Sequence, residues 1–216
     1  QFFIEGRQRY APARYNVEGD WSGASCLLVA GATTGEVTVR NLNPVSLQAD
    51  MAIVDALTRA GAQITTTTDS VTVRRSTLHA FEFDATHCPD LFPALAALAA
   101  SCQGVSTLRG TRRLAHKESD RARTIADVLE NMGISVDLSA PDVMRVTGGE
   151  IRSAEVSSHN DHRIAMAAAV AALRCERGSV TIRGAEAVAK SYPEFWDDLS
   201  GLLRPDENGH NEKTTI

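Results

Sequence analysis

The sequence has 216 residues, of which 43% are apolar and 23% are charged, a balance typical of a globular protein with one or two domains. Its net charge of −5 excludes the overall excess of Lys and Arg that marks a nucleic-acid-binding chain. The apolar runs are too short to span a membrane, and the first residues lack a signal-peptide pattern. The four cysteines form no Cys-x-x-Cys pair, which favours reduced thiols in a cytoplasmic protein over a disulfide scaffold or a zinc site.

Two patterns alternate along the chain. The first is a helix, a glycine and a short β-branched strand, and its three copies have the glycine at Gly35, Gly104 and Gly178. The second is a helix that ends at a glycine and is followed by two strands, with copies at Gly61 and Gly133. Each glycine fits the position after a helix where left-handed backbone stops it. The alternation predicts an α/β fold of three repeated βαβαββ units around a pseudo-threefold axis, with the helices packed together inside.

The predicted elements follow from these patterns in chain order. Helices are expected at residues 24–32, 52–60, 91–100, 119–132, 164–173 and 193–203. Strands are expected at residues 1–5, 36–40, 63–67, 70–74, 105–109, 135–138, 143–147 and 179–183. Residues 15–203 would form the repeat domain, residues 1–14 would belong to a neighbouring domain, and residues 204–216 would be a disordered polar tail.

Five charged or polar residues, from Lys117 to Arg121, stand at the expected start of a helix. A helix N-terminus carries partial positive charge, so a lysine and an arginine at this place suit a bound phosphate or carboxylate. The simpler interpretation is a capping box, with Ser119 as N-cap and ion pairs along a solvated helix.

Other helix entrances repeat this choice between a cap and a functional group. Asp90, before an apolar helix, is either a first-turn acid or a general base held in a cleft. His159 and His162 flank another helix start, where the alternatives are a metal site and two unrelated surface residues. Four cations that capping does not explain stand at three helix entrances, namely Lys117, Arg121, Arg163 and Lys190. They favour an anion site.

Four motifs in these places resemble the signatures of the 5-enolpyruvylshikimate-3-phosphate (EPSP) synthase family, whose members are also called 3-phosphoshikimate 1-carboxyvinyltransferases. The motifs are Gly19–Ser25, Lys117–Arg121, Asn160–Met166 and Lys190–Phe195. The resemblance implies two similar domains, each an inside-out α/β barrel of three βαβαββ units. The chain is similar to the C-terminal portion, which makes residues 1–14 a crossover strand from the missing N-terminal portion.

The resemblance also implies a reaction. Such enzymes transfer the carboxyvinyl group of phosphoenolpyruvate to the 5-hydroxyl of shikimate 3-phosphate, release phosphate, and need no metal or organic cofactor. The implied partners are the two substrates and the missing domain, in a cytoplasmic monomer. The implied roles are phosphoenolpyruvate binding by Arg121, Arg163 and Lys190, shikimate 3-phosphate binding by Asp90 and Lys117, and catalysis by Asp90, Glu118 and His162.

Two features depart from a complete family member. Arg113 stands where many relatives carry Asn, and the register there is loose, so it has no assigned role. The family's active site lies between two domains, so this chain would hold half of it. Two alternatives therefore stay open: a non-catalytic fragment that binds anions weakly, and a sister enzyme that acts on UDP-N-acetylglucosamine.

Overall fold

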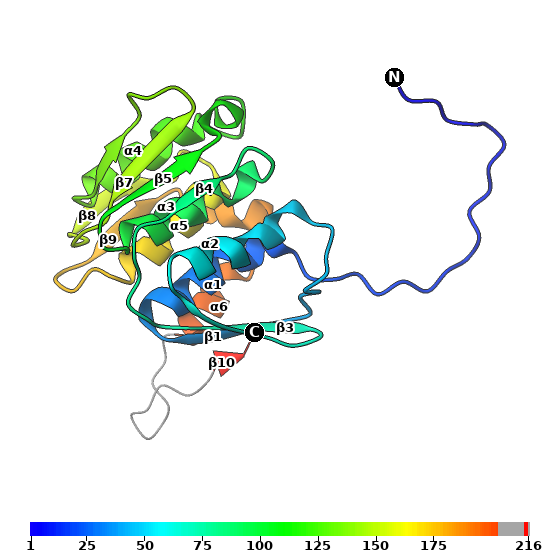
Figure 1. Ribbon diagram of the computed structural model, residues 1–216, viewed down its shortest axis with the longest axis horizontal. Helices are drawn as coiled ribbons and strands as arrows, with labels where there is room; N and C mark the ends of the chain where they lie inside the picture. Colours follow the sequence, from blue (N-terminus) through cyan, green and yellow to red (C-terminus); the bar gives the residue numbers. More distant parts are fainter. Residues whose placement is uncertain (203–213, 216) are drawn as a thin grey trace.

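Three alanine-rich helices form the centre of the computed structural model, which describes residues 1–202 and 214–215. They are α1 (Trp21–Thr34), α3 (Phe92–Ala100) and α5 (His162–Ala172), and they pack against one another. Every residue of α3 is buried, because its sequence is apolar on all sides. Small alanine side chains let helix backbones approach closely. The sheets lie around these helices (Figure 1), so the expected inside-out arrangement is confirmed.

The first unit follows α1. Its further elements are β1 (Glu36–Arg40), the short 3-10 helix η1 (Ala49–Ala52), α2 (Ile53–Arg59), β2 (Gln63–Thr66) and β3 (Ser70–Arg74). Strand β1 pairs antiparallel with β3, which pairs antiparallel with β2. On its other side β1 pairs parallel with β10 (Thr214–Thr215), which gives the sheet order β10-β1-β3-β2.

The second unit has all six elements of the repeat. They are β4 (Glu82–Asp84), α3, β5 (Val105–Arg109), α4 (Arg121–Asn131), β6 (Ser135–Asp137) and β7 (Val143–Thr147). Two 3-10 helices, η2 (Pro89–Leu91) and η3 (Thr111–Leu114), lead into α3 and toward α4. The sheet order β4-β5-β7-β6 repeats that of the first sheet.

The third unit contains β8 (Ala154–Ser157), α5, β9 (Val180–Arg183), the 3-10 helix η4 (Ala185–Lys190) and α6 (Phe195–Leu202). Strands β8 and β9 pair parallel. Within the described residues this sheet has two strands where the others have four. The three copies predicted from the sequence are therefore present, and the third ends after its second helix.

Several local features differ from the sequence-based expectations. The strand expected at residues 1–5, which was assigned to a neighbouring domain, does not form in this chain alone, where residues 1–17 are exposed and extend away from the body (Figure 1). Gly35 ends α1 with an extended backbone, φ −166°, whereas the other four repeat glycines have positive φ. In the predicted disordered tail, Thr214–Thr215 form β10, and residues 203–213 and 216 lie outside the described part.

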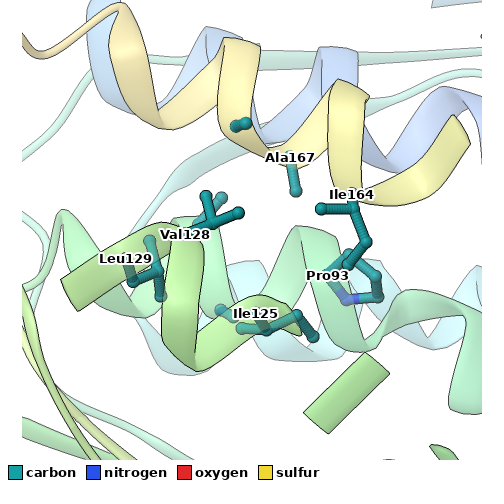
Figure 2. A pocket seen from close by; sticks show the side chains of 9 residues that line it. Pro93, Ile125, Val128, Leu129, Ile164 and Ala167 are labelled. Carbon is teal, nitrogen blue, oxygen red and sulfur yellow. The ribbon is translucent and has the colours of Figure 1, made fainter. Parts of the chain in front are cut away.

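The gap left where three helices meet is small and apolar (Figure 2). About 10 Å³ of space remains between α3, α4 and α5, lined by Pro93, Ala96, Ala97, Ile125, Val128, Leu129, Ile164, Ala167 and Ala168. It has no polar side chain to orient a ligand, so the chemistry lies elsewhere. In the described part of the chain no helix is both long and apolar enough to cross a membrane. All four cysteines are free thiols, as expected.

Candidate active site

Arg121 is the first residue of α4, and its side chain is completely buried. The N-cap of this helix is Asp120, whose carboxylate accepts from the backbone N–H of Arg123. Ser119, predicted to be the cap, instead donates its hydroxyl to Asp161 at 3.0 Å. The helix start is thus capped one residue later than predicted, and the arginine turns inward.

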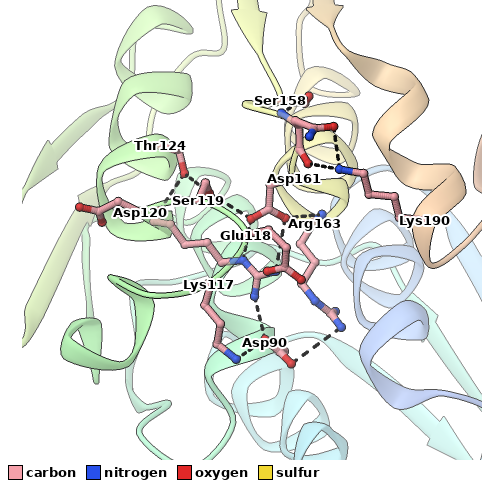
Figure 3. A network of polar contacts seen from close by, with 12 residues as sticks. Asp90, Lys117, Glu118, Ser119, Asp120, Thr124, Ser158, Asp161, Arg163 and Lys190 are labelled. Atoms are coloured by element: carbon pink, nitrogen blue, oxygen red, sulfur yellow. Dashed lines mark hydrogen bonds and ion pairs between the residues drawn. The ribbon is translucent and has the colours of Figure 1, made fainter.

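Three carboxylates surround the Arg121 guanidinium (Figure 3). Its Nε and Nη2 donate to the two oxygens of Asp161, at 2.8 and 3.3 Å. Its Nη1 donates to Asp90 at 2.7 Å, and Nη2 also donates to Glu118. Burial disfavours the charged form of Arg121. The hydrogen bond and the charge of Asp161, with the charges of Glu118 and Asp90, favour the charged form more strongly, so the pKa of Arg121 is raised. The arginine is permanently charged and held in one orientation.

Asp161 was missed in the sequence, although it lies inside a quoted motif. It is the N-cap of α5, where it accepts from the N–H of Arg163 at 3.0 Å, and it is completely buried. Burial opposes its charge, but Arg121, Ser119 and that N–H outweigh the penalty, so its pKa is lowered. Capping alone explained an Asp at this position, so nothing local signalled its second role.

Asp90, in η2, joins the remaining cations. Its Oδ1 lies 3.1 Å from Nζ of Lys117, and its Oδ2 lies 3.9 Å from Nη2 of Arg163. Burial opposes its ionisation, but the hydrogen bond from Lys117 and the charges of Arg163, Lys117 and Arg121 outweigh it and lower its pKa. Its side chain keeps 35% exposure, and Glu118 keeps 44%. The two carboxylates therefore form the solvent side of the cluster, opposite the buried Asp161.

His162 follows Asp161 and is 7% exposed. Neither ring nitrogen has a hydrogen-bond partner. Burial, followed by the charge of Arg163, lowers its pKa, so it is neutral at pH 7. An unpartnered buried imidazole costs stability, which marks this position as one where structure alone does not explain the residue.

Lys190 stands apart from the cluster. At the end of η4, its Nζ donates to the backbone oxygen of Asn160 at 2.7 Å and to the side-chain oxygen at 2.6 Å (Figure 3). Asn160 precedes Asp161, the N-cap of α5, so Lys190 is bonded to the residue next to the cluster. The structure thus brings together Asp90, Lys117, Glu118, Arg121 and Arg163, with Lys190 at their margin.

The expectation of unneutralised cations was wrong for three of the four residues. Lys117, Arg121 and Arg163 face Asp90, Glu118 and Asp161, so the charges of the cluster balance. Lys190 instead bonds to the two neutral oxygens of Asn160. Sequence separations of 31 and 40 residues hid two of these pairs. Among the described residues no group of three or more His, Cys, Asp or Glu is arranged to hold a metal.

Comparisons with known proteins identify the family. The family model described as EPSP synthase (3-phosphoshikimate 1-carboxyvinyltransferase) matches residues 1–199. The chain belongs to the EPSP synthase family. Its similarity to 3-phosphoshikimate 1-carboxyvinyltransferases includes 44% identity over 202 residues with that of Clostridium acetobutylicum and 46% over 190 with that of Thermococcus kodakarensis. These matches cover 93% and 88% of this chain but only 46% and 47% of the relatives, so the chain spans about half their length.

Solved structures give the same picture. The EPSP synthase of Acinetobacter baumannii is 30% identical with a TM-score of 0.72, over 84% of this chain and 45% of that chain. The enolpyruvyl transferase NikO of Streptomyces tendae, at 22% identity and a TM-score of 0.63 over 85% of this chain and 43% of that chain, shares the fold. The four family motifs quoted from the sequence thus belong to a family member whose relatives are twice as long.

Proposed function

We propose that this chain is the C-terminal half of an EPSP synthase. The complete enzyme transfers the carboxyvinyl group of phosphoenolpyruvate to the 5-hydroxyl of shikimate 3-phosphate and releases phosphate. Addition forms a tetrahedral intermediate, and elimination of phosphate follows. No cofactor is required. Family membership supports the reaction, and the remaining argument concerns what the residues of this half do.

The observation that carries the proposal is the two-sided environment of Arg121. Buried Asp161 holds Nε and one side of Nη2, which fixes the plane of the guanidinium. The other hydrogen bonds of the Arg121 guanidinium go to Asp90 and Glu118, which are partly exposed. These two carboxylates have the chemistry of a substrate anion, so phosphoenolpyruvate can take the place of one of them. We assign Arg121, Arg163 and Lys190 to phosphoenolpyruvate.

Asp90 and Lys117 are assigned to shikimate 3-phosphate. A carboxylate bonded to two cations is a poor proton acceptor, because its cations stabilise the ionised form. When a substrate anion binds the cations, Asp90 is released to accept the proton of the 5-hydroxyl. Glu118 is assigned to proton exchange at the methylene carbon, and neutral His162 to the region of the leaving phosphate. Preset cations then stabilise the charged intermediate.

The other half of the enzyme is the expected partner, and it would supply the remaining substrate contacts in a cytoplasmic monomer. The free cysteines agree with a reducing compartment. The isolated chain would therefore be inactive, since half of the site is absent. The chain alone thus corresponds to the non-catalytic fragment of the first alternative, and the complete enzyme carries out the reaction.

Phosphate release tests the proposal. The protein used is a chimera in which this chain replaces the matched part of the Clostridium acetobutylicum relative. We expect release from phosphoenolpyruvate plus shikimate 3-phosphate by the chimera and none by the chain alone. A folded chimera that is active only with UDP-N-acetylglucosamine would favour the sister enzyme, and one inactive with both acceptors would refute the proposed reaction.

A further inference from the structure

Lys190 is held differently from the other three cations of the candidate active site. Lys117, Arg121 and Arg163 lie within ion-pair distance of carboxylates. Lys190 forms no ion pair within the part of the chain that the structure describes, and its Nζ donates instead to the backbone oxygen of Asn160 at 2.7 Å and to the side-chain oxygen at 2.6 Å. Both oxygens are neutral, so they hold the ammonium without compensating its charge. An ammonium has three N–H groups, so the two bonds leave one for a ligand.

Asn160 makes this double contact from an unusual backbone conformation. Its φ is 58°, in the left-handed region, and the preceding His159 also lies there, with φ 51°. Asparagine is one of the few residues other than glycine that adopt this conformation readily. From it, the carbonyl and the side-chain amide of one residue both reach the same ammonium (Figure 3). The position therefore suits a residue that tolerates left-handed backbone and carries a neutral acceptor.

A buried serine connects the turn that contains Asn160 to η4, the element that carries Lys190. The N–H of Asn160 donates to Oγ of Ser158 at 3.1 Å, and the same hydroxyl donates to the backbone oxygen of Gly184 at 2.8 Å. Ser158 is completely buried. Gly184 is the N-cap of η4 and Lys190 is its last residue, so the turn is bonded to both ends of η4. These bonds fix Lys190 relative to α5, whose N-cap Asp161 follows Asn160.

The exposure of both partners favours a role in binding over a role in folding. Asn160 and Lys190 are both exposed, and polar contacts at exposed positions contribute little to the free energy of unfolding. The left-handed backbone at Asn160 costs conformational energy in addition. An anion that binds an unrestrained lysine has to restrict its rotatable bonds, whereas Lys190 is oriented before any ligand arrives. The contact thus prepares a charge for an anion.

We propose that Asn160 is a positioning residue for phosphoenolpyruvate. Its two neutral oxygens orient the ammonium of Lys190 beside Asp161 and leave the positive charge available to an anionic group of the substrate. An aspartate at position 160 would hold the lysine equally well but would cancel its charge. The inference rests on the proposed function, since it takes phosphoenolpyruvate as the ligand of Lys190.

Two substitutions of Asn160 in the chimera separate charge from anchoring. Asn160→Asp keeps an acceptor in a residue that tolerates left-handed backbone but neutralises Lys190, so the KM for phosphoenolpyruvate should rise about 10-fold or more. Asn160→Gly keeps the backbone and the charge but loses one acceptor, so this KM should rise only about 2- to 3-fold. The KM for shikimate 3-phosphate should not change in either variant, because its assigned contacts, Asp90 and Lys117, are not altered.

The order of the two effects decides between positioning and a purely structural role. A structural role predicts the reverse order, because aspartate retains the acceptor that glycine lacks. A rise for Asn160→Gly that equals or exceeds the rise for Asn160→Asp, or an unchanged KM in both variants, would overturn the proposal. The matched control is Asn131→Asp, at an exposed asparagine at the opposite end of α4 from Arg121, which should leave both KM values unchanged.

A titration of the isolated chain tests the same inference without turnover. Phosphoenolpyruvate is added at millimolar concentrations, and the NMR signals of the Lys190 side chain are followed. Asn160→Asp should raise the dissociation constant about 10-fold relative to the wild type. Equal dissociation constants, or Lys190 signals that do not respond in the wild type, would overturn the proposal. An inactive wild-type chimera would refute the proposed reaction, whereas this titration would still decide the role of Asn160.

Discussion

Arg121 and Asp161 lie 40 residues apart in the sequence and form a completely buried, two-bond ion pair, with Nε–Oδ2 at 2.8 Å and Nη2–Oδ1 at 3.3 Å. Each residue stands at the start of a helix, Arg121 in α4 and Asp161 before α5. The pair therefore joins the second and third units at the point where the candidate active site forms. Its integrity decides both the stability of the chain and the orientation of the guanidinium.

Replacing Arg121 with Ala should lower the free energy of unfolding of the chain by ~3–5 kcal/mol, because Asp161 would be left buried and unpaired. Arg121→Lys should recover only part, since an ammonium cannot make the two parallel bonds. Urea unfolding measures both. The control is Arg123→Ala in the same helix, where the side chain is 85% exposed and little change is expected. An unaltered Arg121→Ala protein would show that the pair is not structural.

Asp90→Ala and Glu118→Ala should each slow turnover of the chimera by ~10²–10⁴-fold, as when a positioned acid or base is lost. Their signatures should differ. Loss of Glu118 should suppress exchange of solvent deuterium into the methylene group of phosphoenolpyruvate, whereas loss of Asp90 should impair attack by the hydroxyl more than exchange. Exposed Glu130→Ala is the control. If the Glu118→Ala variant exchanges solvent deuterium into the methylene group at the wild-type rate, the role assigned to Glu118 is wrong.

The buried imidazole of His162 should make stability depend on pH. Its pKa is lowered from 6.5 in the folded chain, so below about pH 6.5 the unfolded chain binds a proton that the folded chain does not. Stability should therefore fall as the pH drops from about 7 toward the lowered pKa. His162→Gln should reduce this fall, whereas His116→Gln, at an exposed histidine, should keep it. Identical pH profiles for the wild type and His162→Gln would contradict the prediction.

Removal of residues 1–14 should leave the free energy of unfolding within error of the full chain, because these residues are exposed and pack against no part of the domain. Thermal unfolding of residues 15–216 checks this, with the full chain as reference. A substantial loss would show that the segment pairs with the domain in solution, and would move the domain boundary from residue 15 toward the N-terminus.

The isolated chain should bind phosphoenolpyruvate and shikimate 3-phosphate no more tightly than about millimolar. Its cations already pair with Asp90, Glu118 and Asp161, so a ligand has to displace existing partners. Each partly exposed ion pair that the ligand forms instead contributes only ~0–1 kcal/mol, so the net gain is small. Calorimetric titration measures this, with the chimera as the positive control. Micromolar binding of both substrates by the isolated chain would mean that its half of the site suffices.

The local elements were largely predictable from the sequence. The strands at residues 70–74 and 143–147 were predicted with their observed bounds, because β-branched residues stand between clear turn signals. The three-unit repeat was also predictable, because each copy carries the same helix, glycine and strand pattern. The N-cap of α4 was misplaced, because the hydroxyl of Ser119 bonds to Asp161 in another unit.

The sequence by itself determined the repeat, the fold class and the motifs that identify the family, because these depend on local periodicity and on residues close together in the chain. Only the tertiary structure decided how the charges pair. Asp90, Arg121 and Asp161 belong to three separate segments, and they meet because η2, α4 and α5 start at one end of the packed helices. Burial at that meeting point then makes the Arg121–Asp161 pair obligatory, since neither charge is stable there alone.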